Sequence, residues 1–240
     1  MAIRRFCAPD LSSPVVRVEG PQAMHALRVL RLGVGESVVL FDGLGAEATG
    51  RILRIDGPAF DVEIDSRRSR GLENRPRLAL AVAMPKGPRA DWLIEKCAEL
   101  GVGDLRPIDC ERSVARPGPG KIDRWRRKCV EAAKQSRQAA VMQIHAPTPL
   151  DAVFRAAPGD MDAYYGSVHG DAVRWTDAID KMEAAGALVL IGPEGGWTQM
   201  EIKALEDSGA TAIRLADSIL RVETAAVAVA AIWACCRPPG

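Results

Sequence analysis

The chain has 240 residues, of which 48% are hydrophobic and 26% charged, so it is long enough to bury the core of one large domain or two smaller ones. Its formal net charge of +1 gives no overall electrostatic attraction to nucleic acid or membranes, and the most apolar stretch, 225–236, is too short to span a bilayer. Six cysteines without paired spacing, three scattered histidines and no apolar signal segment predict a cytoplasmic protein with reduced thiols and no metal site.

The first third of the chain is typical of a small β domain. Residues 21–33 predict one short helix. The apolar runs that follow are short and are interrupted by Asp42-Gly43 and Asp56-Gly57, which are hairpin signals. A small barrel or sandwich with one helix fits this pattern.

The polar stretch 66–77 predicts a domain boundary, which divides the chain into domain 1–72 and domain 76–240. The second domain alternates apolar runs with amphipathic segments. This alternation predicts an α/β fold, with a parallel sheet covered by helices on both faces. The expected elements are strand 77–84, helix 90–101 with Asp91 as a candidate cap, strand 102–110, helix 121–140, strand 188–191, helix 198–208, strand 211–215 and helix 222–235.

A glycine-rich turn, 192–196, follows one of the apolar strands. Ligands of parallel sheets bind beyond the carboxyl ends of the strands, so this turn is a candidate ligand site. The next helix begins with a capping box formed by Thr198 and Glu201, so it does not need the glycines to start. The alternative is a strained connection in which Gly195 and Gly196 adopt positive φ. The spacing matches neither of the common phosphate-binding loops.

A second loop, 215–221, also follows a strand, and it leads into a helix that is apolar almost all round. Such a helix has to be buried, either in the core or against another subunit. Arg221 lies at the N-terminus of this helix, where a cation opposes the helix dipole. It either forms an ion pair with Glu223 or Glu194, or it is presented to a ligand. In the second case the two strand-end loops close on one pocket.

Two C-terminal segments, "LVLIGPEGGWTQMEI" and "LADSILRVETAA", resemble the signatures of the RsmE-type SPOUT methyltransferases. This family comprises 16S ribosomal RNA (uracil-N3)-methyltransferases that use S-adenosylmethionine. "HALRVLRLGVGESVVLFDGLG" resembles the family's N-terminal PUA-like domain, and "MPKGPRADWLIEKCAELGV" and "EAAKQSRQ" resemble two further family segments. The resemblance covers nearly the whole chain, and the ordered set of motifs is specific where any single one is not.

The resemblance implies a PUA-like β-barrel domain followed by an α/β domain with a deep trefoil knot, a topology that general folding rules would reject. It also implies a homodimer through the knot and a substrate in the small ribosomal subunit, near its decoding region. In such proteins the cofactor is bound in a bent shape, largely by backbone groups, to which glycines give access. The residues that the resemblance assigns to the S-adenosylmethionine site are Leu190, Gly192, Pro193, Gly195, Gly196, Leu215, Ile219, Leu220 and Thr224.

Three positions in the last signature depart from the family's usual pattern. Ala216 stands where glycine is common, Ser218 where a basic residue is common, and Val222 where threonine is usual. The loss of the basic residue puts an rRNA contact at this point in doubt, but it leaves the implied cofactor site in place.

The implied reaction requires a group that handles the proton of uracil N3. This proton leaves only well above neutral pH, so either a base or a cation beside the carbonyl oxygens has to assist. The candidate catalytic residues are Arg221, which would stabilise the uracil anion, and Glu194 and Glu223, which would accept the proton. Glu194 has the alternative role of contacting the backbone or the cofactor ribose. Positioning of the base and the methyl group supplies a further part of the rate.

Basic residues are concentrated between positions 112 and 137, where nine of them stand against two acidic residues. RNA affinity comes largely from phosphate neutralisation, so this excess is a candidate RNA surface, with a solvated helix face as the alternative. The apolar residues of helix 121–140 need one face. The residues expected to point outward and bind RNA are therefore Arg124, Arg127, Lys128 and Lys134. His25, Arg28 and Arg31 on the first helix are candidates for a second RNA contact. The alternative is that they are ordinary surface charges.

Three functional hypotheses follow. The first is an RNA methyltransferase acting at uracil N3. The second is a related knotted methyltransferase acting on another base or on ribose. The third is an rRNA-binding assembly factor without catalysis, which the changes at Ala216 and Ser218 keep open and which the presence of Arg221, Glu223 and Thr224 disfavours.

Overall fold

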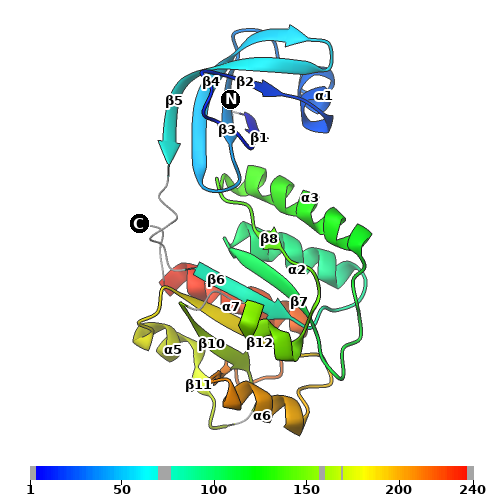
Figure 1. Ribbon diagram of the computed structural model, residues 1–240, viewed down its shortest axis with the longest axis vertical. Coiled ribbons are helices and arrows are strands. Elements are labelled where there is room, and N and C mark those ends of the chain that lie inside the picture. The colour runs from blue at the N-terminus through cyan, green and yellow to red at the C-terminus, as the bar shows by residue number, and fades with distance from the viewer. Residues whose placement is uncertain (1–3, 70–76, 157–159, 169, 237–240) are drawn as a thin grey trace. The chain divides into compact units, whose positions relative to one another are not determined.

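The computed structural model describes residues 4–69, 77–156, 160–168 and 170–236 (Figure 1). The chain divides into two compact units, one formed by 1–73 with 133–141 and the other by 74–132 with 142–240. The sequence placed 133–141 in the second domain, whereas the structure groups it with the first unit. Most of the expected domain boundary, residues 70–76, lies outside the described part of the chain.

The first unit contains one curved five-stranded sheet in the order β1-β3-β4-β5-β2 (Figure 1). Alternating side chains of its strands form a core with the inner face of α1, because successive residues of a strand point to opposite faces. The two predicted hairpins are confirmed, and Gly43 and Gly57 adopt the positive φ that their turns require. The elements are β1 Arg4–Cys7, β2 Val15–Val18, α1 Pro21–Arg28, β3 Ser37–Phe41, β4 Ala46–Asp56 and β5 Ala59–Ser69.

The predicted first helix is shorter than expected. It ends at Arg28, where backbone N–H groups of Val29 and Leu30 both donate to the carbonyl of His25. Arg31 therefore lies beyond the helix, in a left-handed conformation with φ 55°. His25, Arg28 and Arg31 are all exposed, but they do not share one helical face.

The second unit contains a sheet in the order β11-β13-β10-β12-β6-β7-β8, with β9 paired to β7. All pairings among these strands are parallel, as predicted. The central strands β6 and β12 are apolar along their length because both faces of the sheet are covered. The strands are β6 Arg77–Val82, β7 Asp104–Asp109, β8 Gln143–Ile144, β9 Thr148–Pro149, β10 Met161–Gly166, β11 Val173–Arg174, β12 Gly186–Ile191 and β13 Thr211–Arg214.

Helices cover both faces of this sheet. The apolar helix α7, red in Figure 1, packs against α2, α5, β6 and β12, so the prediction that it is buried in the core is confirmed for one of its faces. Side chains of α4 and α6 join the core on the opposite face, at Val153 and Leu205. The helices are α2 Pro88–Glu99, α3 Pro119–Ser136, α4 Val153–Ala156, α5 Trp175–Lys181, α6 Gln199–Asp207 and α7 Val222–Cys236.

Two predictions about helix starts had different outcomes. The capping box of α6 is confirmed: the backbone N–H of Glu201 donates to the Thr198 hydroxyl, and the Thr198 N–H donates to the Glu201 carboxylate. Asp91 as the cap of α2 is wrong. The helix begins three residues earlier, after Gly87, because Pro88 favours the first helical position. The Asp91 carboxylate is then available to neighbouring side chains.

The six cysteines are all free thiols. Burial raises the pKa of Cys97, Cys110 and Cys129 to about 12, so these thiols stay protonated and unreactive at neutral pH. In the described part of the chain, no helix combines the length and apolar character needed to cross a membrane. The same residues contain no group of three or more His, Cys, Asp or Glu side chains that could hold a metal ion.

Candidate functional site

A pocket of about 580 Å³ lies beyond the carboxyl ends of β10, β12 and β13. This is the edge at which parallel sheets bind ligands, and the volume is typical of small-molecule sites. Three strand-end segments form most of its wall: 165–168, 191–197 and 213–220. The predicted turn and the predicted loop therefore do close on one pocket, and the segment after β10 completes it.

Gly192 opens the turn after β12 and packs against an aromatic ring. A Cβ atom at this position would lie 2.7 Å from the Trp197 ring, closer than any real contact. The Trp197 indole N–H donates to the carbonyl of Gly166, at 3.0 Å, and so fixes the ring between two walls of the pocket. Glycine at 192 is thus required by Trp197, a role that sequence analysis did not predict.

Gly195 and Gly196 differ in their reasons for being glycine. Gly196 has φ +70°, and its N–H donates to the carbonyl of Pro193 at 2.9 Å, which closes the turn. The expected positive φ is wrong for Gly195. Instead, a Cβ there would lie 3.2 Å from the Arg112 side chain, and the Arg112 guanidinium donates to the Gly195 carbonyl at 2.8 Å. The loop after β7 therefore supports the turn after β12.

The loop 215–221 supplies the apolar wall of the pocket. Leu215, Ile219 and Leu220 line it, together with Ala216 and Ser218 at the positions that depart from the family pattern. Ile219 is 83% exposed. A ligand in the pocket would bury it.

Two predicted lining residues lie elsewhere. Leu190 is fully buried in the core between β6 and the helices α4 and α6, whereas its neighbour Ile191 lines the pocket. The reason is the alternation of a strand, which sends adjacent side chains to opposite faces. Thr224 is exposed on the first turn of α7 and is outside the pocket lining, although Val222 and Ala225 belong to it.

The candidate acids meet at a cation that sequence analysis did not select. Arg89, in the first turn of α2, lies 2.5 Å from Glu194 and 3.7 Å from Glu223, measured from Nη1 to Oε1 in each case. Of the two alternatives for Arg221, the ion pair with Glu223 or Glu194 is therefore wrong, because both carboxylates are paired with Arg89. The Arg221 side chain is exposed and has no ion-pair partner in the described part of the chain. The hydrogen bond to Glu194 raises the pKa of Arg89, which stays charged.

Glu223 is the unusual member of this group. It is only 7% exposed, and its Oε2 atom has no hydrogen-bond partner within the described structure. A buried carboxylate oxygen without a donor is costly, so such an atom calls for an explanation. Glu223 itself is not among the residues that line the pocket, although its neighbour Val222 is.

One signal in the sequence pointed to Arg89. It follows Pro88 at the start of α2, where a cation opposes the helix dipole as Arg221 does in α7. The same argument therefore applied to both arginines. Trp197 and Arg112 gave no such signal, because an aromatic residue after a turn and a basic residue in a loop are common.

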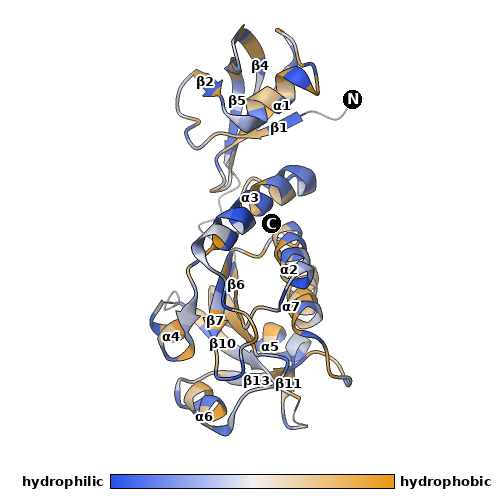
Figure 2. Cartoon of the chain, turned by 90° about the vertical axis from the view of Figure 1, so that its right-hand side faces the viewer, coloured by the Kyte–Doolittle hydropathy of each residue, from blue (hydrophilic) through white to orange (hydrophobic). Residues whose placement is uncertain are grey.

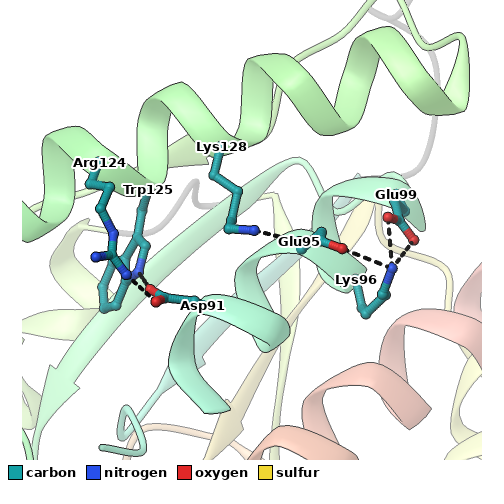
Figure 3. Close-up of polar contacts among 7 residues, drawn as sticks. All are labelled: Asp91, Glu95, Lys96, Glu99, Arg124, Trp125 and Lys128. Carbon is teal, nitrogen blue, oxygen red and sulfur yellow. Dashed lines mark hydrogen bonds and ion pairs between the residues drawn. The ribbon is translucent and has the colours of Figure 1, made fainter. Parts of the chain in front are cut away.

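The predicted RNA surface on α3, blue in Figure 2, is partly occupied by contacts with α2. Arg124 forms an ion pair with Asp91, and Lys128 forms one with Glu95 (Figure 3). The Trp125 indole N–H also donates to Asp91, at 2.7 Å. The expectation that Lys128 points outward is wrong, and the charge of Arg124 is partly compensated. Two helices that carry opposite charges on facing sides produce this result.

The remaining α3 candidates differ in exposure. Arg127 is exposed and has no ion-pair partner among the described residues, whereas Lys134 is only half-exposed. Arg126 is held by the carbonyl of Ile144 and the carboxylate of Asp123. Arg127 is therefore the α3 candidate that is most accessible to a phosphate.

Residues 73–234 match the RNA methyltransferase domain family, and residues 18–65 match the RNA methyltransferase PUA domain family. The ribosomal RNA small subunit methyltransferase E of Mycobacterium bovis is 30% identical over 231 residues, which cover 93% of this chain and 87% of that protein.

Solved structures match over the same extent. A ribosomal RNA small subunit methyltransferase E from Neisseria gonorrhoeae, bound to S-adenosyl methionine, has a TM-score of 0.83 and 27% identity and covers 98% of both chains. A methyltransferase from Legionella pneumophila in complex with the same cofactor has a TM-score of 0.83 and 26% identity, also over 98% of both chains. The expected PUA-like domain and SPOUT domain are thereby confirmed. The chain belongs to the RsmE-type SPOUT methyltransferases, the family of the ribosomal RNA small subunit methyltransferases E.

Proposed function

We propose that this protein transfers the methyl group of S-adenosylmethionine to N3 of a uridine in 16S rRNA, in the decoding region of the small ribosomal subunit. The observation that carries the proposal is the pocket beyond β10, β12 and β13, which is built from the two segments with the family signatures and adjoins the Glu194–Arg89–Glu223 group. Family membership supports the reaction and the cofactor, and the resemblance of the signatures supports the N3 position.

The residues around the pocket fit S-adenosylmethionine. Its volume of about 580 Å³ lies within the usual range for ligands of this size. Apolar side chains suit the adenine ring, and backbone groups of the turn suit its polar edge and the ribose. Gly196 lines the pocket, and apart from its chain neighbours no protein atom lies within 4 Å of the position that its Cβ would occupy. The residues that would hold the cofactor are Gly192, Pro193, Gly195, Gly196, Leu215, Ile219 and Leu220. Thr224, which the resemblance also assigns to the cofactor, lies outside the pocket lining.

When bound, the cofactor supplies an electrophilic methyl group, and the protein has to supply a nucleophilic uracil nitrogen. The N3 proton passes to a carboxylate. The candidates are Glu194, which lines the pocket, and Glu223, which is buried outside the lining and whose Oε2 atom has no hydrogen-bond partner among the described residues. The N3–CH3 bond then forms as the S–CH3 bond breaks. Glu194 is more exposed and is already bonded to Arg89, which suits a contact at the pocket rim.

Arg221 has the complementary role of stabilising the uracil anion. It is exposed beside the pocket, and its charge is not used in any ion pair of the described residues. A preorganised cation beside a developing negative charge lowers the barrier without reorganisation at the moment of reaction. The pocket walls would hold the two reactants in line, which adds the contribution of positioning.

We infer that the RNA is bound by basic residues outside the pocket. On α3 the first of these is Arg127. Arg124 and Lys128 follow, whose charges are partly compensated by ion pairs, and Lys134, whose side chain is less exposed. In the first unit, His25, Arg28 and Arg31 are exposed and available to phosphates. Domain 1–72 would thus contribute to RNA binding, and domain 76–240 would both bind RNA and carry out the chemistry.

We also infer a cytoplasmic homodimer that forms through the knotted part of the second domain. The supporting observation is α7, whose core face is buried while Val227, Ala231 and Ile232 remain partly exposed on another face. An apolar face of this kind suits a second copy of the chain. Sedimentation of the full chain would show a dimer, and Ile232→Glu would give the monomer.

The test is methyl transfer to small subunits from cells that lack the activity. The protein is incubated with labelled S-adenosylmethionine, the rRNA is digested, and the nucleoside is identified by mass spectrometry. We expect 3-methyluridine, formed about 100-fold more slowly by Arg221→Ala. A different methylated nucleoside would support the ribose or other-base hypothesis. Cofactor binding without any transfer would support the assembly factor.

A further inference from the structure

We propose that Arg112 is a positioning residue that sets the affinity for S-adenosylmethionine by fixing the backbone of the turn 193–196. This role rests on the proposed function, because it takes the pocket beyond β10, β12 and β13 as the cofactor site. Gly195 and Gly196 line this pocket, whereas Arg112 lies outside its lining. Arg112 therefore acts on the cofactor only through the turn.

The peptide unit between Gly195 and Gly196 is held at both ends. The Arg112 guanidinium donates to the Gly195 carbonyl oxygen at 2.8 Å, and the Gly196 N–H donates to the Pro193 carbonyl oxygen at 2.9 Å. A trans peptide unit is planar, so two hydrogen bonds at its opposite ends fix its orientation. Without Arg112 the bond to Pro193 remains, but two successive glycines leave the backbone wide conformational freedom.

The side-chain stem of Arg112 also packs against the turn. A Cβ atom at Gly195 would lie 3.2 Å from Cδ and 3.4 Å from Cβ of Arg112. Gly195 is not among the glycines with positive φ, so its own backbone conformation is open to other residues. The close approach of Arg112 is therefore the reason that a glycine is needed at this position.

The loop that carries Arg112 is itself fixed on both sides of this residue. The Glu111 N–H donates to the Glu201 carboxylate at 2.9 Å, and the same carboxylate takes part in the capping box of α6. The Cys110 N–H donates to the Ser113 hydroxyl at 2.8 Å, which closes the loop. Arg112 thus extends from a braced backbone, as preorganisation of a binding site requires.

Arg89 reaches the same turn but contacts one of its side chains. It pairs with the carboxylate of Glu194 at 2.5 Å. The rotatable bonds of Glu194 lie between this contact and the main chain, so Arg89 restrains the backbone less than a hydrogen bond to a carbonyl oxygen does. The orientation of the turn therefore depends more on Arg112.

The test compares Arg112→Met with Arg112→Lys in the full chain, by calorimetric titration with S-adenosylmethionine. Met keeps an unbranched stem and removes the donor, whereas Lys keeps both a stem and a donor. We expect Arg112→Met to raise the Kd about 3-fold to 10-fold and Arg112→Lys to return it to within about twofold. At saturating cofactor, kcat should change less than about threefold, because a binding contact of this kind acts equally on the ground state and the transition state.

Arg116→Met is the matched control. It removes an exposed arginine from the same loop, where Arg116 is paired with Asp109 at 2.8 Å. The loss of charge is the same as in Arg112→Met, but the turn loses no contact. We expect the Kd for S-adenosylmethionine to stay within about twofold of that of the unmodified protein.

A second measurement examines the packing between Gly195 and Arg112. The Cβ atom that Gly195→Ala adds displaces the stem of Arg112, whereas in an Arg112→Ala background it meets only the Cβ atom, at 3.4 Å. We expect Gly195→Ala to raise the Kd about fivefold alone and less than about twofold in the Arg112→Ala background, since residues in contact have non-additive effects. Equal rises in the two backgrounds would contradict the packing.

The outcomes separate this role of Arg112 from the proposed function. If the protein binds S-adenosylmethionine but makes no 3-methyluridine, the proposed reaction fails, and the Kd comparison still decides the role of Arg112. An unchanged Kd in Arg112→Met overturns the inference, even where the midpoint of thermal unfolding falls, because a purely structural contact would give that result. An equal rise in Arg116→Met also overturns it, since the cause would then be the lost charge.

Discussion

Helix α2 carries two groups of charges that are used in opposite ways. At its N-terminus, Arg89 reaches the pocket edge, defined here as Arg89, Glu194 and Glu223. Less than two turns later, Asp91 and Glu95 face α3 and form the α2–α3 seam with Arg124 and Lys128 (Figure 3). In the seam every one of these charges has a partner, whereas the pocket edge leaves one buried oxygen without a donor.

The contrast between the seam and the pocket edge indicates which charged groups have a functional role. Paired charges at a partly exposed helix contact contribute about 0–1 kcal/mol each and serve mainly to fix the contact. A buried carboxylate oxygen without a partner costs free energy in the absence of a ligand. Such a cost persists where the group has a use, so the unsatisfied atom is more informative than the four satisfied charges.

The largest expected effect comes from removing the unsatisfied acid. Glu223→Gln should lower kcat about 100-fold or more at neutral pH, because an amide cannot accept the N3 proton. The measurement is the initial rate of 3-methyluridine formation. The matched variant Glu95→Gln in the seam should keep kcat within about twofold, since Glu95 lies on the side of α2 that faces α3 and is paired there with Lys128. Comparable losses in both variants would remove the distinction between the two groups.

A change of intermediate size is expected from Gly192→Ala. The added Cβ would lie 2.7 Å from the Trp197 ring, so the ring or the turn has to move. Overpacking of this kind costs about 1–3 kcal/mol of the free energy of unfolding, measurable by urea denaturation. Cofactor affinity should fall as well, because Trp197 lines the pocket.

Gly120→Ala is the control for this substitution. It lies in the first turn of α3, where a Cβ meets no atom within 4 Å, and alanine favours the helix. We expect it to leave stability unchanged or raise it by up to about 1 kcal/mol, with no effect on cofactor binding. A fully stable Gly192→Ala variant that binds the cofactor normally would refute the packing role of Trp197.

The sequence predicted the elements and the place of the pocket better than it predicted the contacts around it. Strand and helix alternation is a local property of the chain, and parallel strands put their loops at one edge, so the turn and the loop 215–221 were correctly brought together. The partner of Glu194 and Glu223 is Arg89, which is far away in the sequence. The local sequence does not indicate whether Arg89 or Arg221, which both lie at the start of a helix, forms the ion pairs with these acids.

The faces of elements near the site were harder to predict for a similar reason. In β12 the sequence is apolar throughout, so it does not distinguish Leu190, which enters the core, from Ile191, which lines the pocket. On α3 the apolar face was predicted correctly. However, the facing side of α2 carries two acids, which form ion pairs with two of the basic residues that were assigned to RNA binding. Tertiary packing, rather than periodicity, decides which charges remain available.

The smallest expected effect tests this last point within α3. Arg127→Ala should weaken binding of small-subunit RNA a few-fold and reduce the slope of log affinity against log salt by about 1, as the loss of one phosphate contact would. Lys128→Ala should leave the slope unchanged, because its ammonium group is held by Glu95 and its side chain is only 33% exposed. Both variants remove one positive charge, so long-range attraction changes equally and the slope isolates the contact. Equal slopes in the two variants would mean that the ion pair with Glu95 opens when RNA binds.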